Sequence, residues 1–169
     1  MAGSYRWLRA VAAALIALSA LQAAAKPGWD QAANIKGAAE RLAQLQRSGG
    51  LTGAYQFISA CYKTHGLASA YSQPFEACII QDYILTKMTA AVYQRLTEDA
   101  RQKLGAPEPQ SMLAAMSRRV SLAFAQYKIS EADARSLLTR TEREGLPVFA
   151  KATFPQGQPE DTVEPPKQE

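Results

Sequence analysis

The sequence CYKTHGLASAYSQPFEAC, residues 61–78, contains both cysteines and the only histidine of the 169-residue chain. Apolar residues precede it at helical spacing, and His65-Gly66 is typical of a helix end, because glycine tolerates the left-handed conformation that often follows a helix. Pro74, shortly after Ser72, favours a new helix, since proline suits the first helical turn. The stretch therefore predicts two antiparallel helices joined by a short loop.

Cys61 and Cys78 fall on the apolar faces predicted for these two helices, near the ends that the loop joins. Antiparallel packing would bring those ends together, so we predict a Cys61–Cys78 disulfide. Closing a loop of this size stabilises the fold by roughly 3 kcal/mol through the entropy of the unfolded chain. The alternative is a pair of buried free thiols, and the choice depends on the compartment in which the protein resides.

Residues 1–25 have the pattern of a secretory signal peptide. Arg6 and Arg9 form its positive start, residues 11–21 form an apolar core, and a run of alanines ends at Ala25. The apolar core is short for a membrane span, which needs about 20 residues. We therefore predict cleavage after Ala25 and a periplasmic or secreted protein, with an uncleaved anchor as the alternative. Cysteines pair in such an oxidising compartment, which favours the disulfide.

Residues 26–154 are predicted to form a single domain, long enough to bury a core. Removal of the signal takes away two of the 19 basic residues and none of the 15 acidic ones, so the formal charge falls from +4 to about +2. This charge gives no indication of nucleic-acid binding. Residues 155–169 are rich in Pro, Glu and Gln, have little to bury, and are predicted to form a disordered tail.

The fold class predicted for the domain is all-α, an irregular bundle of four or five helices with one disulfide. Apolar residues at helical spacing predict a helix from about residue 30 to residue 47, ended by the glycines of Ser48-Gly49-Gly50. A fourth helical pattern covers residues 109–127. Its Arg118 and Arg119 lie off the apolar stripe, so we expect them to be exposed.

The remaining helices are predicted from their start and stop signals. Ser130 and Asp133 resemble a capping box, and Gly145 is expected to end the helix that follows. Thr97 precedes two acidic residues, which favour a helix start. Residues 97–104 are therefore either a new helix or a continuation of the second hairpin helix, which carries an apolar stripe that includes Val92.

The least ordinary polar group surrounds the predicted disulfide: Tyr62, His65, Tyr71, Gln81 and Asp82. Gln81 falls in phase with the apolar face, where a buried amide needs a hydrogen-bond partner, and Asp82 lies at the edge of that face. One interpretation is structural: tyrosine hydroxyls and one buried amide hold the loop down. The other is a recognition patch, in which the tyrosines are rigid anchors and Gln81 and Asp82 orient a ligand.

No catalytic or cofactor motif is present in the sequence. A single histidine excludes a histidine-rich metal site, the cysteine spacing is not that of a C-x-x-C motif, and G-x-S-x-G is absent. A haem held by His65 and a methionine is compatible with a helical bundle, but such residues are far commoner in loops and cores. We therefore predict no catalytic residue, no metal site and no cofactor.

The function expected from these patterns is that of an exported, non-catalytic protein that binds a partner protein or a small ligand in the cell envelope. The first alternative is a periplasmic stress chaperone or an inhibitor of an envelope enzyme, because amphipathic helices rich in Ala and Met can rearrange to expose apolar surface. A hydrolase of unknown type comes third. No stable membrane span is expected after signal cleavage.

Protein recovered from its own cell envelope should begin at Lys26 and contain no free thiol. Its intact mass, measured after denaturation without a reducing agent, should equal that of residues 26–169 less two hydrogen atoms. A mass that includes residues 1–25 would contradict the cleavage, and titratable thiols in the same sample would contradict the disulfide.

Overall fold

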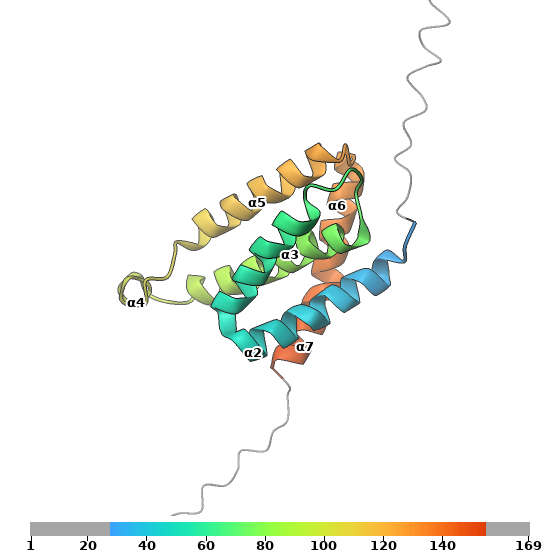
Figure 1. Ribbon diagram of the computed structural model, residues 1–169. Helices are drawn as coiled ribbons and strands as arrows, with labels where there is room; N and C mark the ends of the chain where they lie inside the picture. The colour runs from blue at the N-terminus through green and yellow to red at the C-terminus, as the bar shows by residue number, and fades with distance from the viewer. Residues whose placement is uncertain (1–27, 155–169) are drawn as a thin grey trace, which may run out of the picture.

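The computed structural model describes residues 28–154, and every regular element within them is a helix (Figure 1). The predicted signal, residues 1–25, and the predicted tail, residues 155–169, lie outside the described residues. The elements in order are α2 (Gln31–His65), α3 (Gln73–Gln94), α4 (Glu98–Lys103), α5 (Pro109–Gln126), α6 (Glu131–Arg140), the π-helix η1 (Thr141–Gly145) and α7 (Leu146–Thr153). The last three join end to end, which leaves five helical rods and confirms the all-α bundle.

Side-chain caps begin the helices where the sequence predicts. Asp30 accepts hydrogen bonds from two backbone N–H groups of the first turn of α2, at 2.9 and 3.1 Å. Thr97 accepts from the N–H of Ala100 at 3.3 Å, so α4 is a separate short helix and not a continuation of α3. Ser130 accepts from the N–H of Asp133 at 3.1 Å and donates to its carboxylate at 2.6 Å, which confirms the cap of α6.

The kink at Gly50 divides α2 into two straight halves. Gly50 has φ +62° and ψ −169°, a conformation that glycine adopts without the steric penalty of a Cβ atom. Figure 1 shows the sharp turn between the two halves, near the label of α2. The predicted stop at residues 48–50 is thus confirmed as the end of the first straight segment.

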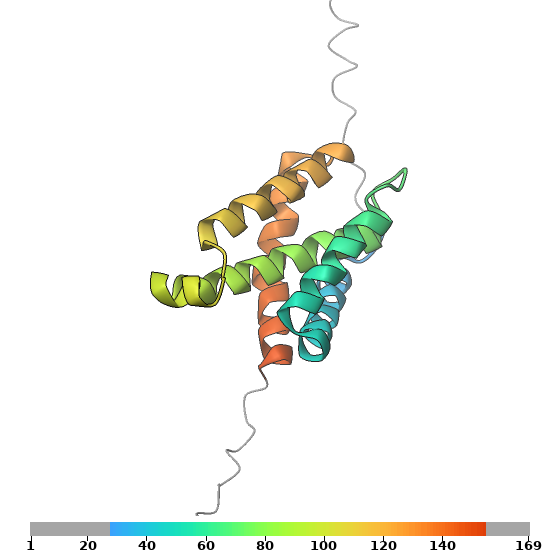
Figure 2. The same ribbon diagram turned by 60° about the vertical axis from the view of Figure 1, so that its left-hand side comes forward.

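Helix α3 is the centre of the bundle. Helix α2 packs against it along one side, α5 along another, and the rod formed by α6, η1 and α7 crosses it at a steep angle (Figure 2). A helix surrounded in this way is buried on more than one face. Its largest buried apolar side chains are Phe75, Ile79, Ile80, Ile84 and Leu85.

The last turn of α3 projects beyond its neighbours together with α4 (Figure 1). Val92 was expected on the buried stripe, and this expectation is wrong, since the residue is 53% exposed. Helical phase places Val92 on the same face of α3 as the buried residues. Near the C-terminal end of α3, however, this face is not covered by another helix.

The Cys61–Cys78 disulfide is confirmed, with the two Cα atoms 5.8 Å apart. Cys78 is fully buried, whereas Cys61 is half-buried.

The expectation that Gly66 adopts a left-handed conformation is wrong, because its φ is −73°. Instead, the Gly66 N–H continues the helical hydrogen bonding to the carbonyl oxygen of Tyr62 at 2.8 Å, and the chain leaves the helix over the next residues.

Gly145 does not end a helix, contrary to the sequence prediction. It is buried inside the continuous rod, at the last position of the π-helix η1. A Cβ atom there would lie 3.0 Å from Ile84 Cδ1 and 3.2 Å from Ile35 Cγ2. The missing side chain therefore allows the rod to cross close to both α2 and α3.

Gly145→Ala should lower the free energy of unfolding by about 1–3 kcal/mol, because the added methyl group overpacks the crossing. Gly37→Ala is the matched control: this glycine is exposed within α2, nothing lies within 4 Å of an added Cβ, and alanine should stabilise the helix by about 0.5–1 kcal/mol. Chemical denaturation measures both. Equal effects of the two substitutions would mean that the crossing is not tightly packed.

Candidate functional site

Two acidic residues of α3, Glu76 and Asp82, have no solvent exposure. Burial of a carboxylate costs several kcal/mol unless hydrogen bonds or a counter-charge offset it. The two residues meet this requirement in different ways, and they organise different parts of the molecule.

The Asp82 carboxylate is paired with Arg119 of α5. The Arg119 Nη2 donates to Oδ1 at 2.8 Å and Nε donates to Oδ2 at 3.0 Å. Tyr62 donates to Oδ2 and Thr86 donates to Oδ1, both at 3.2 Å. Helices α2 and α5 are therefore both bonded to one carboxylate of α3.

Burial and the Asp82 charge together raise the pKa of Tyr62 well above its usual range. The hydrogen bond from Arg119 to Asp82 raises the pKa of that guanidinium. The sequence prediction that Arg119 is exposed is confirmed, since its side chain is 45% exposed. The sequence did not show that its charged end also bonds a buried carboxylate. Helical phase describes the Cα position and does not show where a long side chain reaches.

The Glu76 carboxylate accepts four hydrogen bonds from uncharged donors. The Trp29 indole N–H and the Asn34 amide donate to Oε1, each at 2.9 Å. The Gln31 amide at 3.1 Å and the Tyr71 hydroxyl at 3.3 Å donate to Oε2. One carboxylate thus links the chain before α2, the start of α2, the hairpin loop and α3.

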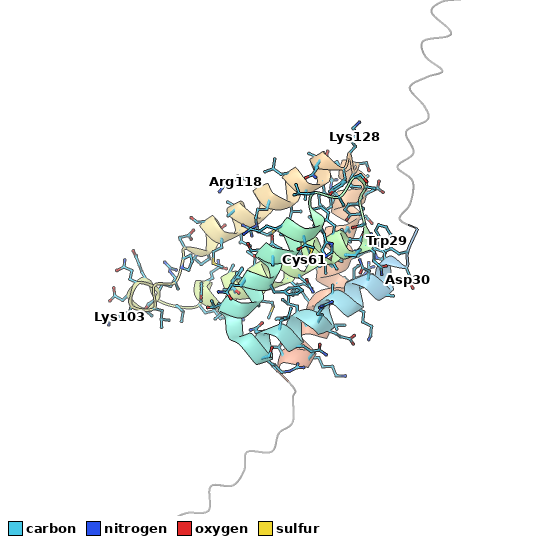
Figure 3. The ribbon with its side chains drawn as sticks, in the orientation of Figure 1. Trp29, Asp30, Cys61, Lys103, Arg118 and Lys128 are labelled. Atoms are coloured by element: carbon cyan, nitrogen blue, oxygen red, sulfur yellow. A yellow bond between two sulfur atoms is a disulfide. The ribbon has the colours of Figure 1, made fainter. Side chains whose placement is uncertain are left out.

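A cleft of about 650 Å³ opens beside the Glu76 network, between the hairpin loop and the corner where α5 meets α6. Its polar wall includes Gln31, Glu76 and Ser136. Figure 3 places Trp29 and Lys128, which both line the cleft, at the same end of the bundle. Its apolar wall consists of Trp29, Tyr71, Phe124, Tyr127, Ile129 and Leu137.

Three aromatic rings of this wall form a continuous row. The ring centroid of Tyr71 lies 5.9 Å from that of Trp29 and 5.8 Å from that of Tyr127. The Tyr127 hydroxyl lies 3.0 Å from the carbonyl oxygen of Gly66 and 3.1 Å from that of Ala68, so it donates to the backbone of the hairpin loop. Burial and the Glu76 charge raise the pKa of Tyr71 above its usual range.

Arg140 borders the cleft from the end of α6. Its Nη1 donates to Gln31 Oε1 at 2.9 Å, and Gln31 in turn donates to Glu76. The same guanidinium makes two hydrogen bonds to Glu144, at 3.2 and 3.0 Å. Arg140 and Arg143 lower the pKa of Glu144 to about 2, so the Arg140–Glu144 pair is ionised throughout the neutral range.

A second cleft, of about 530 Å³, lies between the two halves of α2 and the start of α3. His65 and Gln81 line it, together with Arg41 and Phe57, and the Arg41 guanidinium lies 5.4 Å from the centroid of the Phe57 ring. Gln81 is 2% exposed, and its amide donates to the carbonyl oxygen of Ala38 at 3.2 Å.

The five residues singled out from the sequence therefore do not form one surface. Tyr71 lines the first cleft, His65 and Gln81 line the second, and Tyr62 bonds Asp82 inside the bundle. Of the polar groups in this set, only the Tyr71 hydroxyl ties the loop to α3, through Glu76. The Tyr62 hydroxyl and the Gln81 amide join α2 to α3 instead.

Sequence reasoning missed the Glu76 network. Glu76 lies in the first turn of α3, where an acidic residue commonly stays in solvent and stabilises the helix start. Its donors Trp29, Gln31 and Asn34 lie more than 40 residues away. The one available signal was the set of donor side chains around the start of α2, but donor type alone does not identify an acceptor.

No family model, curated protein or solved structure matches the chain. Within residues 28–154, no group of three or more His, Cys, Asp or Glu side chains is arranged to hold a metal ion. In the same part of the chain, no helix has both the length and the apolar character needed to cross a membrane.

Arg119→Ala should destabilise the protein, because it leaves the buried Asp82 without a counter-charge. Since the guanidinium is partly exposed, we expect the lower end of the range for breaking a buried pair, about 3 kcal/mol. The neighbouring Arg118 is exposed on the outer side of α5 (Figure 3), and Arg118→Ala should change stability by no more than about 0.5 kcal/mol. Comparable losses in urea denaturation of both variants would contradict a specific role of the Asp82–Arg119 pair.

Proposed function

We propose that this protein is an exported, non-catalytic binding protein that holds a small ligand in the cleft beside Glu76. The observation that carries the proposal is the row of three aromatic rings, two of which donate hydrogen bonds to a buried carboxylate that accepts four. The cleft volume of about 650 Å³ falls within the range of small-molecule sites, which are mostly apolar with a few fixed polar groups.

The cleft walls are held in place before any ligand binds. Trp29 and Tyr71 are fixed by their hydrogen bonds to Glu76, and Tyr127 is fixed by the loop carbonyl groups. Rings that are already oriented lose little conformational entropy on binding. This preorganisation supports a binding role for the cleft rather than a purely structural one.

A non-catalytic role is supported by the state of the polar groups. A carboxylate has about four acceptor positions, and four donors occupy those of Glu76. Arg140 is already engaged by Glu144 and Gln31. These groups are committed to protein contacts, so they are poorly placed to exchange protons with a ligand.

Export is supported by the signal-like residues 1–25 and by the disulfide, since stable disulfides are typical of oxidising compartments. The proposed location is the periplasm or the exterior of the cell.

The first test is the native mass of the protein recovered from its own cell envelope without tags. We expect a mass above that of the bare chain, from a ligand that is released on denaturation. Binding of the released compound is then followed by tryptophan fluorescence, because Trp29 is the sole tryptophan once residues 1–25 are removed.

Ser136→Phe should weaken that binding by more than about tenfold, because an exposed serine of the cleft wall is replaced by a ring that fills the space. Ser121→Phe, on an exposed position of α5 away from the cleft, is the matched control and should bind normally. Equal binding by the two variants would contradict the assignment of the cleft. Failure of the native protein and of an envelope extract to show any saturable ligand would contradict the binding function itself.

A further inference from the structure

The Glu76 carboxylate is buried and makes no salt bridge with any of the described residues. Its four hydrogen-bond donors are an indole, two amides and a phenol, all uncharged. Asp82, in contrast, is paired with Arg119. Hydrogen bonds from neutral groups stabilise the Glu76 charge, but they do not cancel it.

The other charges that line the cleft balance Glu76 only in part. Arg140 shares Glu144 with Arg143, so one carboxylate offsets only part of the charge of the two guanidinium groups. Arg140 also reaches the Glu76 network through Gln31. Lys128 and Asp133 are both exposed at the rim and have opposite signs, and solvent screens such groups strongly. The Glu76 carboxylate is fully buried beside Trp29 and Tyr71, and the part of its field that Arg140 leaves unbalanced favours a cation at these rings.

The aromatic row also favours a cation. The face of an aromatic ring carries a negative partial charge, and a cation within about 6 Å of the ring centre is attracted to it, most strongly by tryptophan. Lysine and arginine side chains occupy other rings of this protein: Arg41 lies over Phe57 and Lys87 over Tyr83. Among the described residues, no such contact involves Trp29, Tyr71 or Tyr127, whose rings border the cleft.

The hydrogen bonding of Glu76 selects among cations. A primary ammonium group needs acceptors for its three N–H donors, and the acceptor positions of Glu76 are already occupied. A quaternary ammonium group has no N–H donor and needs only a negative field and apolar contact. The walls formed by Trp29, Tyr71, Phe124 and Tyr127 offer that contact.

We propose that the ligand of this cleft is a small quaternary ammonium compound, whose charged group lies against the Trp29–Tyr71–Tyr127 row above Glu76. This inference deepens the proposed function and depends on it. It concerns only the charge and type of the ligand, so it can fail while the cleft remains a binding site.

The test compares choline with dimethylbutanol, the uncharged analogue in which a carbon atom replaces the nitrogen. Both are titrated into the protein lacking residues 1–25, with Trp29 fluorescence as the readout and dimethylbutyrate as an anionic analogue. Choline should bind at least about tenfold more tightly than either analogue, as expected for a desolvated cation–aromatic contact.

Tyr71→Leu provides the second measurement, because it keeps apolar volume but removes the central ring. Choline affinity should fall about tenfold, and dimethylbutanol affinity should fall much less. Tyr93→Leu, at the opposite end of α3 from the cleft, should leave the affinities for choline and for dimethylbutanol unchanged. Tyr71 also bonds Glu76, so the melting temperature of the Tyr71→Leu variant is measured first to check that it folds. The comparison of the three ligands uses the unaltered protein and does not depend on this variant.

Equal affinity for choline and dimethylbutanol would overturn the inference and leave an apolar binding cleft. Tighter binding of dimethylbutyrate would also overturn it and would assign recognition to Arg140 and Lys128. If none of the three compounds binds, the inference that the ligand is a quaternary ammonium compound is overturned. The proposed binding function is tested separately, by the compound released from the native protein.

Discussion

The buried carboxylate of Glu76 imposes the strongest single constraint on this structure. A carboxylate removed from water must be surrounded by donors, and the bundle supplies them from segments far apart in sequence. Trp29, Asn34 and Tyr71 are all positioned by this requirement. The same contacts that solvate the charge also hold two aromatic rings at the edge of the cleft, so the stability of the fold and the shape of the candidate site have one physical origin.

Helix α3 carries the other buried carboxylate, and its environment differs in kind. Asp82 is neutralised by Arg119, whose bidentate contact fixes α5 against α3. Such a pair contributes to orientation more than to net stability, because the desolvation of both groups offsets much of their attraction. The Asp82 pair therefore joins α5 to the middle of α3, whereas the Glu76 network joins the chain before α2, the start of α2 and the hairpin loop to the start of α3.

Two glycines make the arrangement of the helices feasible. Gly50 allows α2 to turn sharply, so that both halves of one helix contact α3, the first at Ala38 and the second at Cys61. Gly145 allows the α6–α7 rod to cross close to Ile35 and Ile84. The disulfide between Cys61 and Cys78 then closes the hairpin whose loop carries Tyr71. These features bring the loop, the chain before α2 and the corner of α5 and α6 to one end of the bundle.

The local pattern of the sequence determined the helical class, the hairpin, the disulfide and most helix starts, because these depend on side-chain spacing and on caps within a few residues. The caps at Asp30, Thr97 and Ser130 are examples. Only the tertiary structure decided the candidate site. Glu76 resembles an ordinary acidic residue of a first helical turn, and its burial depends on donors more than 40 residues distant. Periodicity identifies the face on which a residue lies, whereas the packing of other segments decides whether that face meets water, a charge or a ring.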